Sequence, residues 1–141
     1  MAIVVRRMKA EAEEIAAVIA VDKVTFDDCP YSAEEVLGRL DFDRYPMFVA
    51  ESEGDIIGFV AFMKVQTLHY KGLWIDLIAV RPEHQGKGIG KALIKAGQVL
   101  AESEQVDFQS ALVRADNRPS SHAFEHEGYT WEHPFRLYIK S

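Results

Sequence analysis

A glycine-rich segment between two apolar runs is the part of this sequence best suited to chemistry. Gln85-Gly-Lys-Gly-Ile-Gly90 follows the apolar run Leu73–Val80 and opens a stretch with helical periodicity that reaches about Glu102. The first turn of a helix has N–H groups without intrahelical partners, and the helix dipole adds partial positive charge there. Glycine lacks the Cβ that would hold a phosphate away from these groups, and Lys87 and Lys91 add positive charge. The segment is therefore suited to binding a diphosphate.

Two common nucleotide-binding patterns do not fit this segment. A P-loop needs four residues between a glycine and Gly-Lys-Ser/Thr, and that spacing is absent. A dinucleotide fingerprint needs the pattern GxGxxG, whereas the glycines here are Gly86, Gly88 and Gly90. No acidic residue stands in the matching place on a following strand. Both nucleotide interpretations are therefore excluded.

The segment instead resembles the Q/R-x-x-G-x-G/A signature of the GNAT acyltransferase superfamily. Val80-Arg-Pro-Glu-His is similar to the approach from strand to loop in these enzymes. Asn117, followed by Phe124-Glu-His-Glu-Gly128-Tyr129, resembles their second signature, an Asn and then a Tyr-Glu-x-x-Gly-Phe block. The predicted order of elements is also similar, so the resemblance covers essentially the whole chain.

The resemblance implies a fold, a co-substrate and a geometry. It implies an α/β (α+β) GNAT fold with a mixed, mostly antiparallel sheet, whose central strands splay between Leu73–Val80 and Gln109–Val113. The pantetheine arm of acetyl-CoA would enter that gap and pair with backbone groups near Ile78 and Val80, and the N–H near Ile78 would polarise the thioester carbonyl. Asn117 would contact the pantetheine or the pyrophosphate. The implied cofactor-binding residues are Ile78, Ala79, Val80, Gln85, Gly86, Lys87, Gly88, Ile89, Gly90, Lys91, Asn117 and Phe124.

Phe124 departs from the family pattern. Many members have a tyrosine there, whose hydroxyl can protonate the departing CoA thiolate, and phenylalanine has no such proton. Phe124 is therefore expected to bind the cofactor rather than to act in catalysis. The proton would come from water or from another tyrosine, with Tyr70, Tyr129 and Tyr138 as open candidates.

Asp76 is the candidate general base, because it interrupts an otherwise apolar strand. Strand alternation predicts that it shares a face with Trp74, Ile78 and Val80. Apolar surroundings would raise the pKa of the carboxyl, as suits a base. A structural role for Asp76 remains open, in which it accepts hydrogen bonds from a neighbouring loop or lies at a solvent-exposed end of the strand. The alternative general base is His69, in the loop before this strand.

The elements that position these residues follow from periodicity and turn signals. Ser32 and Glu35 predict a capping box, and Glu53-Gly54-Asp55 predicts a hairpin turn. We expect strands at Ile3–Arg7, Pro46–Glu51, Ile56–Val65, Leu73–Val80, Asp107–Val113 and Phe135–Ile139. We expect helices at Lys9–Phe26, Ala33–Leu40, Gly88–Glu102 and Asn117–Glu127. Together they predict one mixed α/β domain over residues 1–141.

Composition narrows the possible partners. The net charge of −6 opposes nucleic-acid binding and suits a cationic amine. The chain has a single cysteine, Cys29, and no metal-binding spacing, signal peptide or membrane span, so we expect a cytoplasmic protein without a metal. The GNAT resemblance implies that Asp27, Asp28 and Tyr31 form one wall of the acceptor site, where acidic residues would suit a cationic amine; a plain exposed loop is the open alternative. The resemblance also implies a homodimer as one option; the sequence shows no interface signature, and Phe135–Ile139 is the candidate place for an interface.

Two functions from different classes follow. The first is an N-acetyltransferase that moves an acetyl group from acetyl-CoA to a primary amine of a small molecule or peptide by direct attack, since no well-placed Cys or Ser suggests a covalent intermediate. The second is a non-catalytic CoA-binding or sensor module of the same fold. A purely structural domain is disfavoured, because glycines at a helix start cost stability without a ligand.

Overall fold

The computed structural model describes residues 2–26 and 29–141, so Asp27 and Asp28 lie outside the described residues. The helices are α1 (Ala12–Thr25), α2 (Ala33–Arg39), α3 (Ile89–Glu104) and α4 (Arg118–His126), with one 3₁₀ turn at Pro82–His84. The strands are β1 (Ile3–Arg7), β2 (Met47–Ser52), β3 (Asp55–Gln66), β4 (Lys71–Val80) and β5 (Phe108–Ala111). These bounds confirm four helices and five of the six strands that the sequence predicts, within a few residues.

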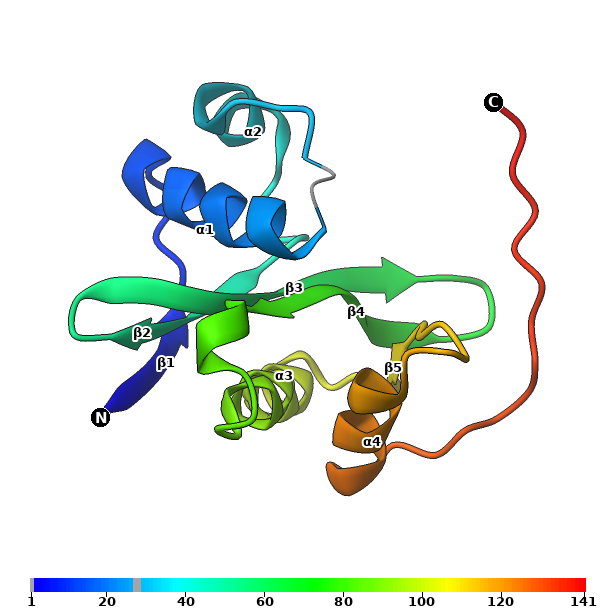
Figure 1. Cartoon of the computed structure of the whole chain (residues 1–141). Coiled ribbons are helices and arrows are strands. Elements are labelled where there is room, and N and C mark those ends of the chain that lie inside the picture. The colour runs from blue at the N-terminus through cyan, green and yellow to red at the C-terminus, as the bar shows by residue number, and fades with distance from the viewer. Residues whose placement is uncertain (1, 27–28) are drawn as a thin grey trace.

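The five strands form one mixed sheet in the order β1-β2-β3-β4-β5. The first three pairings are antiparallel, and β5 runs parallel to β4. The helices α1 and α2 lie on one face of the sheet, and α3 and α4 lie on the other (Figure 1). This arrangement confirms the predicted α/β class. It also separates the glycine-rich turn, which leads into α3, from the face that α1 and α2 cover.

Each face of the sheet has its own apolar core. Ile15, Val18 and Val21 of α1 pack against Val49 and Phe59 of the sheet. On the opposite face, a second cluster joins the sheet to α3 and α4; it includes Phe62, Leu73, Ile75, Leu93, Ile94 and Phe124. The sheet is thus the middle layer of three, and its strand ends set the position of α3.

Local signals in the sequence account for the turns and caps. The Ser32 hydroxyl accepts a hydrogen bond from the Glu35 N–H at 3.1 Å, and the Glu35 carboxylate accepts one from the Ser32 N–H at 3.3 Å, so the predicted capping box is confirmed. Between β2 and β3, Glu53 and Gly54 both have positive φ angles, 51° and 85°. Such angles are typical of a tight hairpin turn, as predicted.

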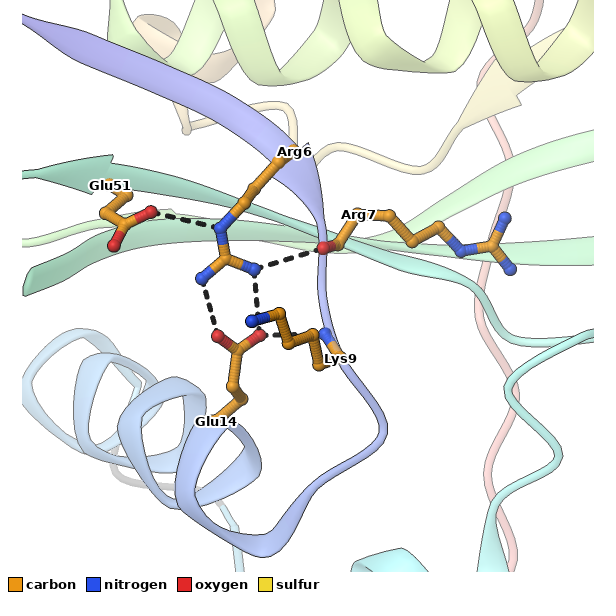
Figure 2. Close-up of polar contacts among 5 residues, drawn as sticks. All are labelled: Arg6, Arg7, Lys9, Glu14 and Glu51. Atoms are coloured by element: carbon orange, nitrogen blue, oxygen red, sulfur yellow. Dashed lines mark hydrogen bonds and ion pairs between the residues drawn. The ribbon is translucent and has the colours of Figure 1, made fainter. Parts of the chain in front are cut away.

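An ion-pair network connects α1 to the strands β1 and β2 (Figure 2). Arg6 of β1 donates to both carboxylate oxygens of Glu14 on α1, at 2.9 and 2.5 Å, and to Glu51 of β2 at 3.0 Å. Glu14 also accepts from the N–H of Lys9 at 2.7 Å. The hydrogen bond from Arg6 lowers the pKa of Glu14. The network therefore joins two strands and a helix through groups that are less than a third exposed.

The predicted strand Phe135–Ile139 is wrong. Residues 130–141 have no regular secondary structure, and the tail runs away from the sheet (Figure 1). Phe135, Leu137, Tyr138 and Ile139 are 77–84% exposed. Strand propensity describes how side chains fit a paired, half-buried surface. No strand of the described residues pairs with this segment, so its apolar pattern alone does not produce a strand.

None of the helices in the described part of the chain is both long enough and apolar enough to cross a membrane.

Candidate functional site

The glycine-rich turn joins the end of β4 to the start of α3. Gly86 and Gly88 have φ angles of 78° and 79°, in the left-handed region that glycine adopts without a steric penalty. Gly88 is the N-cap of α3, and among residues 2–26 and 29–141 no side chain forms a capping hydrogen bond at this helix end. The first-turn N–H groups of a 16-residue helix are therefore presented without a side-chain acceptor.

Space and charge around this turn suit an anion. A Cβ added at Gly86, Gly88 or Gly90 would meet no atom within 4 Å, so all three glycines border open space. Lys87 is exposed and Lys91 is half-buried beside them. These features fit the predicted diphosphate cradle.

The side chain of Gln85 ties the turn to the strand before it. Its Nε2 donates to the carbonyl oxygen of Val80 at 3.1 Å. The glycine-rich turn is thereby held next to the end of β4. Ile89, the first residue of α3, is buried at 3% exposure, so its side chain anchors the helix start while its backbone remains part of the turn.

The strands β4 and β5 part halfway along β4, as predicted. Their parallel pairing begins at Gly72 and Phe108 and ends at Ile75 and Ala111. Beyond that point β4 continues to Val80 without a β5 partner. Residues 76–80 therefore leave one backbone edge of β4 open, beside the start of α3.

The register of β3 and β4 shows which backbone groups face this open edge. The Arg81 N–H donates to the Ile57 carbonyl at 2.8 Å, and the antiparallel register continues from there with Val80 opposite Gly58. Hydrogen-bonded and non-hydrogen-bonded pairs alternate along such a ladder. Because Arg81 and Ile57 form a hydrogen-bonded pair, Val80 and Ile78 stand at non-hydrogen-bonded positions of this ladder. Their N–H and C=O groups therefore point away from β3 and toward the open edge. Those of Ala79 point at β3, and its side chain is buried.

Asp76 is the extra residue of a β-bulge. Leu77 pairs with Ala61 and Ile75 pairs with Phe62, so Asp76 has no partner of its own on β3. The bulge lies directly after the last pair between β4 and β5. Since a bulge re-aims the strand that contains it, the regular alternation of side chains fails at this point.

The predicted surroundings of Asp76 are therefore wrong. The α3-side core includes Ile75, and both Ile78 and Val80 pack against it. In a regular strand, the side chain of Ile75 would lie on the opposite face of the sheet from those of Ile78 and Val80. The side chain of Asp76 points to the α1 and α2 face instead and is exposed. The apolar burial that the sequence predicts for the Asp76 carboxyl is therefore absent.

Tyr45 is the partner of Asp76, and it is a residue that sequence reasoning missed. The Tyr45 hydroxyl donates to Oδ2 of Asp76 at 2.5 Å. Tyr45 precedes β2 and packs against the α1-side core. Burial, and then the hydrogen bond to Asp76, raise the pKa of Tyr45 well above its ordinary value of 10.0. One open alternative for Asp76, that it accepts a hydrogen bond from a neighbouring loop, is the arrangement found here.

The second signature forms the start of α4 and the contact of α4 with the core. Asn117 is the N-cap of α4, and its Oδ1 accepts from the Ser120 N–H at 3.2 Å. Phe124 is buried at 6% exposure in the α3-side core, with its ring edge-on to that of Tyr129 at 5.1 Å. Gly128 follows the helix with a φ angle of 89°, as expected of a glycine that ends a helix.

None of the three tyrosines considered as proton donors lies at the open edge. Tyr70 precedes β4 and its ring packs at a tilt against that of Phe108, at the opposite end of the strand. Tyr129 donates to Gln109 at 3.3 Å and lines a cavity of about 150 Å³ between α3, β5 and the end of α4. Tyr138 is 84% exposed in the tail. His69, the alternative base, is exposed in the turn between β3 and β4.

Among the curated proteins, the chain is similar to acetyltransferases. It is 32% identical over 122 residues to mycothiol acetyltransferase of Streptomyces griseus subsp. griseus, which covers 82% of this chain and 39% of that protein. It is 28% identical to streptothricin acetyltransferase of Streptomyces lavendulae, over 77% of this chain and 57% of that protein. The chain thus spans about two-fifths of the length of the mycothiol acetyltransferase that it matches.

Solved structures share the fold at lower identity. The aminoglycoside acetyltransferase meta-AAC0020, from an uncultured soil metagenomic sample, superposes with a TM-score of 0.87 at 17% identity, over 99% of this chain and 95% of that chain. AAC(6')-Iy, in complex with the bisubstrate analog CoA-S-monomethyl-acetylneamine, superposes with a TM-score of 0.79 at 18% identity, over 100% and 99%.

The model of the family described as "Acetyltransferase (GNAT) family" matches residues 11–129. This match runs from the start of α1 to the residue after Gly128, and it includes both signatures and the open edge of β4. The chain therefore belongs to the GNAT acetyltransferase family.

Proposed function

We propose that this chain transfers an acetyl group from acetyl-CoA to a primary amine of a small molecule or peptide by direct attack. The observation that carries the proposal is the open backbone edge at Ile78 and Val80 directly beside the glycine cradle. A binding site for a long ligand with a diphosphate at one end and amides along its arm needs both features, side by side. The similarity to named acetyltransferases supports the same class of reaction.

The residues of the turn fit the diphosphate of acetyl-CoA, which supplies an acetyl group activated as a thioester. The N–H groups from Gly86 to Lys91 would hold the diphosphate, and Lys87 would add charge. The backbone of Ile78 and Val80 would pair with the amides of the arm as a neighbouring strand does. Asn117 would contribute its amide NH₂, because its oxygen already caps α4.

The chemistry at the open edge needs one hydrogen-bond donor and one proton acceptor. The Ile78 N–H would donate to the carbonyl oxygen that gains charge as the amine attacks. A bond forms between the amine nitrogen and the carbonyl carbon, the carbon–sulfur bond breaks, and sulfur leaves as a thiolate. Asp76 is the candidate to receive the proton that nitrogen loses, directly or through water. The carboxylate lies two residues, about 7 Å of strand, from Ile78.

A cationic amine is the acceptor class that this site favours. The net charge of the chain is −6, and Asp76 offers an exposed carboxylate at the point where β4 and β5 part. Proteins similar to this chain in sequence or in fold include acetyltransferases for aminoglycosides and for streptothricin, and a ribosomal-protein-alanine N-acetyltransferase. These names support both a small molecule and a peptide amine as acceptor.

A non-catalytic CoA-binding module is the second candidate. One observation favours it: Phe124 has no hydroxyl and is buried, and none of the tyrosines weighed as donors lies at the open edge. A CoA thiolate can take its proton from water, so the missing donor lowers the expected rate without excluding transfer. General acid assistance is typically worth about 10²–10⁴-fold.

Release of free thiol from acetyl-CoA, measured against a panel of amines and peptides, separates the two candidates. The enzyme predicts release that depends on one class of acceptor and falls by at least about tenfold in Asp76→Asn. Asp43→Asn is the matched control, since Asp43 is an exposed carboxylate in the loop that leads to Tyr45. Binding of acetyl-CoA without release for any acceptor would support the binding module and contradict the enzyme.

A further inference from the structure

The position of Tyr45 is set by its surroundings rather than by Asp76. Its N–H donates to the Asp41 carbonyl at 2.8 Å, and the carbonyl of the next residue, Pro46, accepts from the Phe62 N–H at 2.9 Å. The ring packs against the core between α1 and the sheet. The hydroxyl is therefore held at a defined place over β4, and a tyrosine that lacked Asp76 would keep that place.

Asp76, in contrast, has little else to orient it. It is exposed, and as the extra residue of the bulge it has no partner on β3. An exposed carboxylate samples several rotamers unless a neighbour selects one. The 2.5 Å hydrogen bond from Tyr45 to Oδ2 selects one orientation. The carboxylate has about four acceptor sites, so one further donor, such as an amine N–H, can still bind.

The direction of this hydrogen bond is fixed. Burial and the neighbouring carboxylate both keep the proton on the Tyr45 oxygen, since they raise the pKa of the phenol. Asp22, which is 7% exposed on α1, opposes ionisation of the phenol as well. Tyr45 therefore keeps its proton, donates to the Asp76 carboxylate, and does not compete for the proton that the acceptor amine loses.

We propose that Tyr45 is a positioning residue, which holds the Asp76 carboxylate in one orientation on the α1 and α2 face of β4, where it receives the acceptor amine. The proposal rests on the proposed transferase function and adds a residue from the loop between α2 and β2 to the site. It also assigns the acceptor to the sheet face that α1 and α2 cover, away from α3.

The test is a double-mutant cycle on thiol release, with Tyr45→Phe, Asp76→Asn and the double variant. Tyr45→Phe keeps the ring and removes only the hydroxyl. It should lower kcat by at least about fivefold, consistent with loss of a hydrogen bond to a charged group, and leave the Kd for acetyl-CoA unchanged. In the Asp76→Asn background, the same change should alter kcat less than about twofold, because a positioning residue acts only through its partner.

A residue that merely supports the fold would behave differently. It would lower kcat by the same factor in both backgrounds, or would lower thermal stability with kcat unchanged, and either result would overturn the positioning role. A wild-type chain that binds acetyl-CoA but acetylates no amine would instead contradict the proposed transferase function. The two failures are distinguishable. The positioning role can fail only in a wild-type chain that turns over acetyl-CoA, whereas the transferase function fails if the wild type shows no turnover.

Discussion

Gly97 of α3 lies against the ring of Phe62 of β3, so closely that a Cβ added to Gly97 would stand 2.7 Å from Cε1 of that ring. Phe62 is fully buried, so its ring has no room to swing aside. The missing side chain at Gly97 lets α3 approach the sheet closely. Close packing of α3 in turn keeps its N-terminus, together with the glycine-rich turn, beside the open edge of β4.

Replacement of Gly97 by alanine should therefore destabilise the protein. We expect Gly97→Ala to lower the free energy of unfolding by about 1–3 kcal/mol, the usual cost of overpacking a core, as measured by urea denaturation. Gly38→Ala is the matched control, because Gly38 lies in α2 and an added Cβ would meet nothing within 4 Å. It should stabilise by up to about 1 kcal/mol. Equal effects of the two variants would contradict the close contact.

The ion-pair network around Arg6 should contribute more than an ordinary surface pair. Arg6→Ala leaves two partly buried carboxylates without their cation, Glu14 and Glu51, and should lower the free energy of unfolding by about 1–3 kcal/mol. Arg114→Ala removes a pair with Asp116 whose side chains are 84% and 70% exposed, and should cost less than about 1 kcal/mol. Thermal or urea unfolding of both variants measures these losses. A loss for Arg114→Ala equal to or larger than that for Arg6→Ala would contradict the prediction.

The same network makes stability depend on acid pH. Because Arg6 lowers the pKa of Glu14 below its ordinary value of 4.5, the stabilisation is complete above pH 4.5. It is lost as the pH falls through the lower value of the folded state. Arg6→Ala should therefore lose less stability than the wild type between about pH 5 and pH 3, in unfolding curves recorded across this range. If the free energy of unfolding falls equally with pH in the two proteins, the pair of Arg6 and Glu14 is not the origin of the pH dependence.

Tyr129 should not be the proton donor to the leaving thiolate. Burial raises its pKa to about 12, and its hydroxyl donates to Gln109, whose strand partner is Leu73 rather than a residue of the open edge. Tyr129→Phe should keep kcat for thiol release within about threefold of the wild type, whereas loss of a general acid typically costs about 10²–10⁴-fold. A loss in that larger range would place Tyr129 in the reaction.

Local patterns in the sequence were enough to predict most of the fold. The apolar runs of β3 and β4, the hairpin glycine Gly54 and the periodicity of α3 are all signals between near neighbours in the chain. The start of α3 after a glycine-rich turn was predictable for the same reason, since Gly86, Gly88 and the helix that they open lie within one short segment. The separation of β4 from β5 was predicted from the family resemblance rather than from residue patterns.

The missed features depend on contacts between distant segments. Tyr45 and Asp76 are 31 positions apart, and no motif links them. The bulge at Asp76 depends on how β4 matches β3, and it reversed the face that alternation predicts. The segment Phe135–Ile139 has an apolar, strand-like pattern, but a strand also needs a partner edge, which a pattern within one segment cannot supply.

Binding of acetyl-CoA to Gly90→Glu, measured by isothermal titration calorimetry, tests the central claim most directly. Gly90 borders open space and has no positive φ angle, so a glutamate there adds bulk and negative charge to the cradle without the backbone strain expected at Gly88. Gly38→Glu is the matched control on exposed α2. We predict that the wild type and Gly38→Glu bind alike and that Gly90→Glu binds at least about tenfold more weakly. Equal binding by all three proteins, or none by the wild type, would contradict the assignment of this turn as the diphosphate cradle.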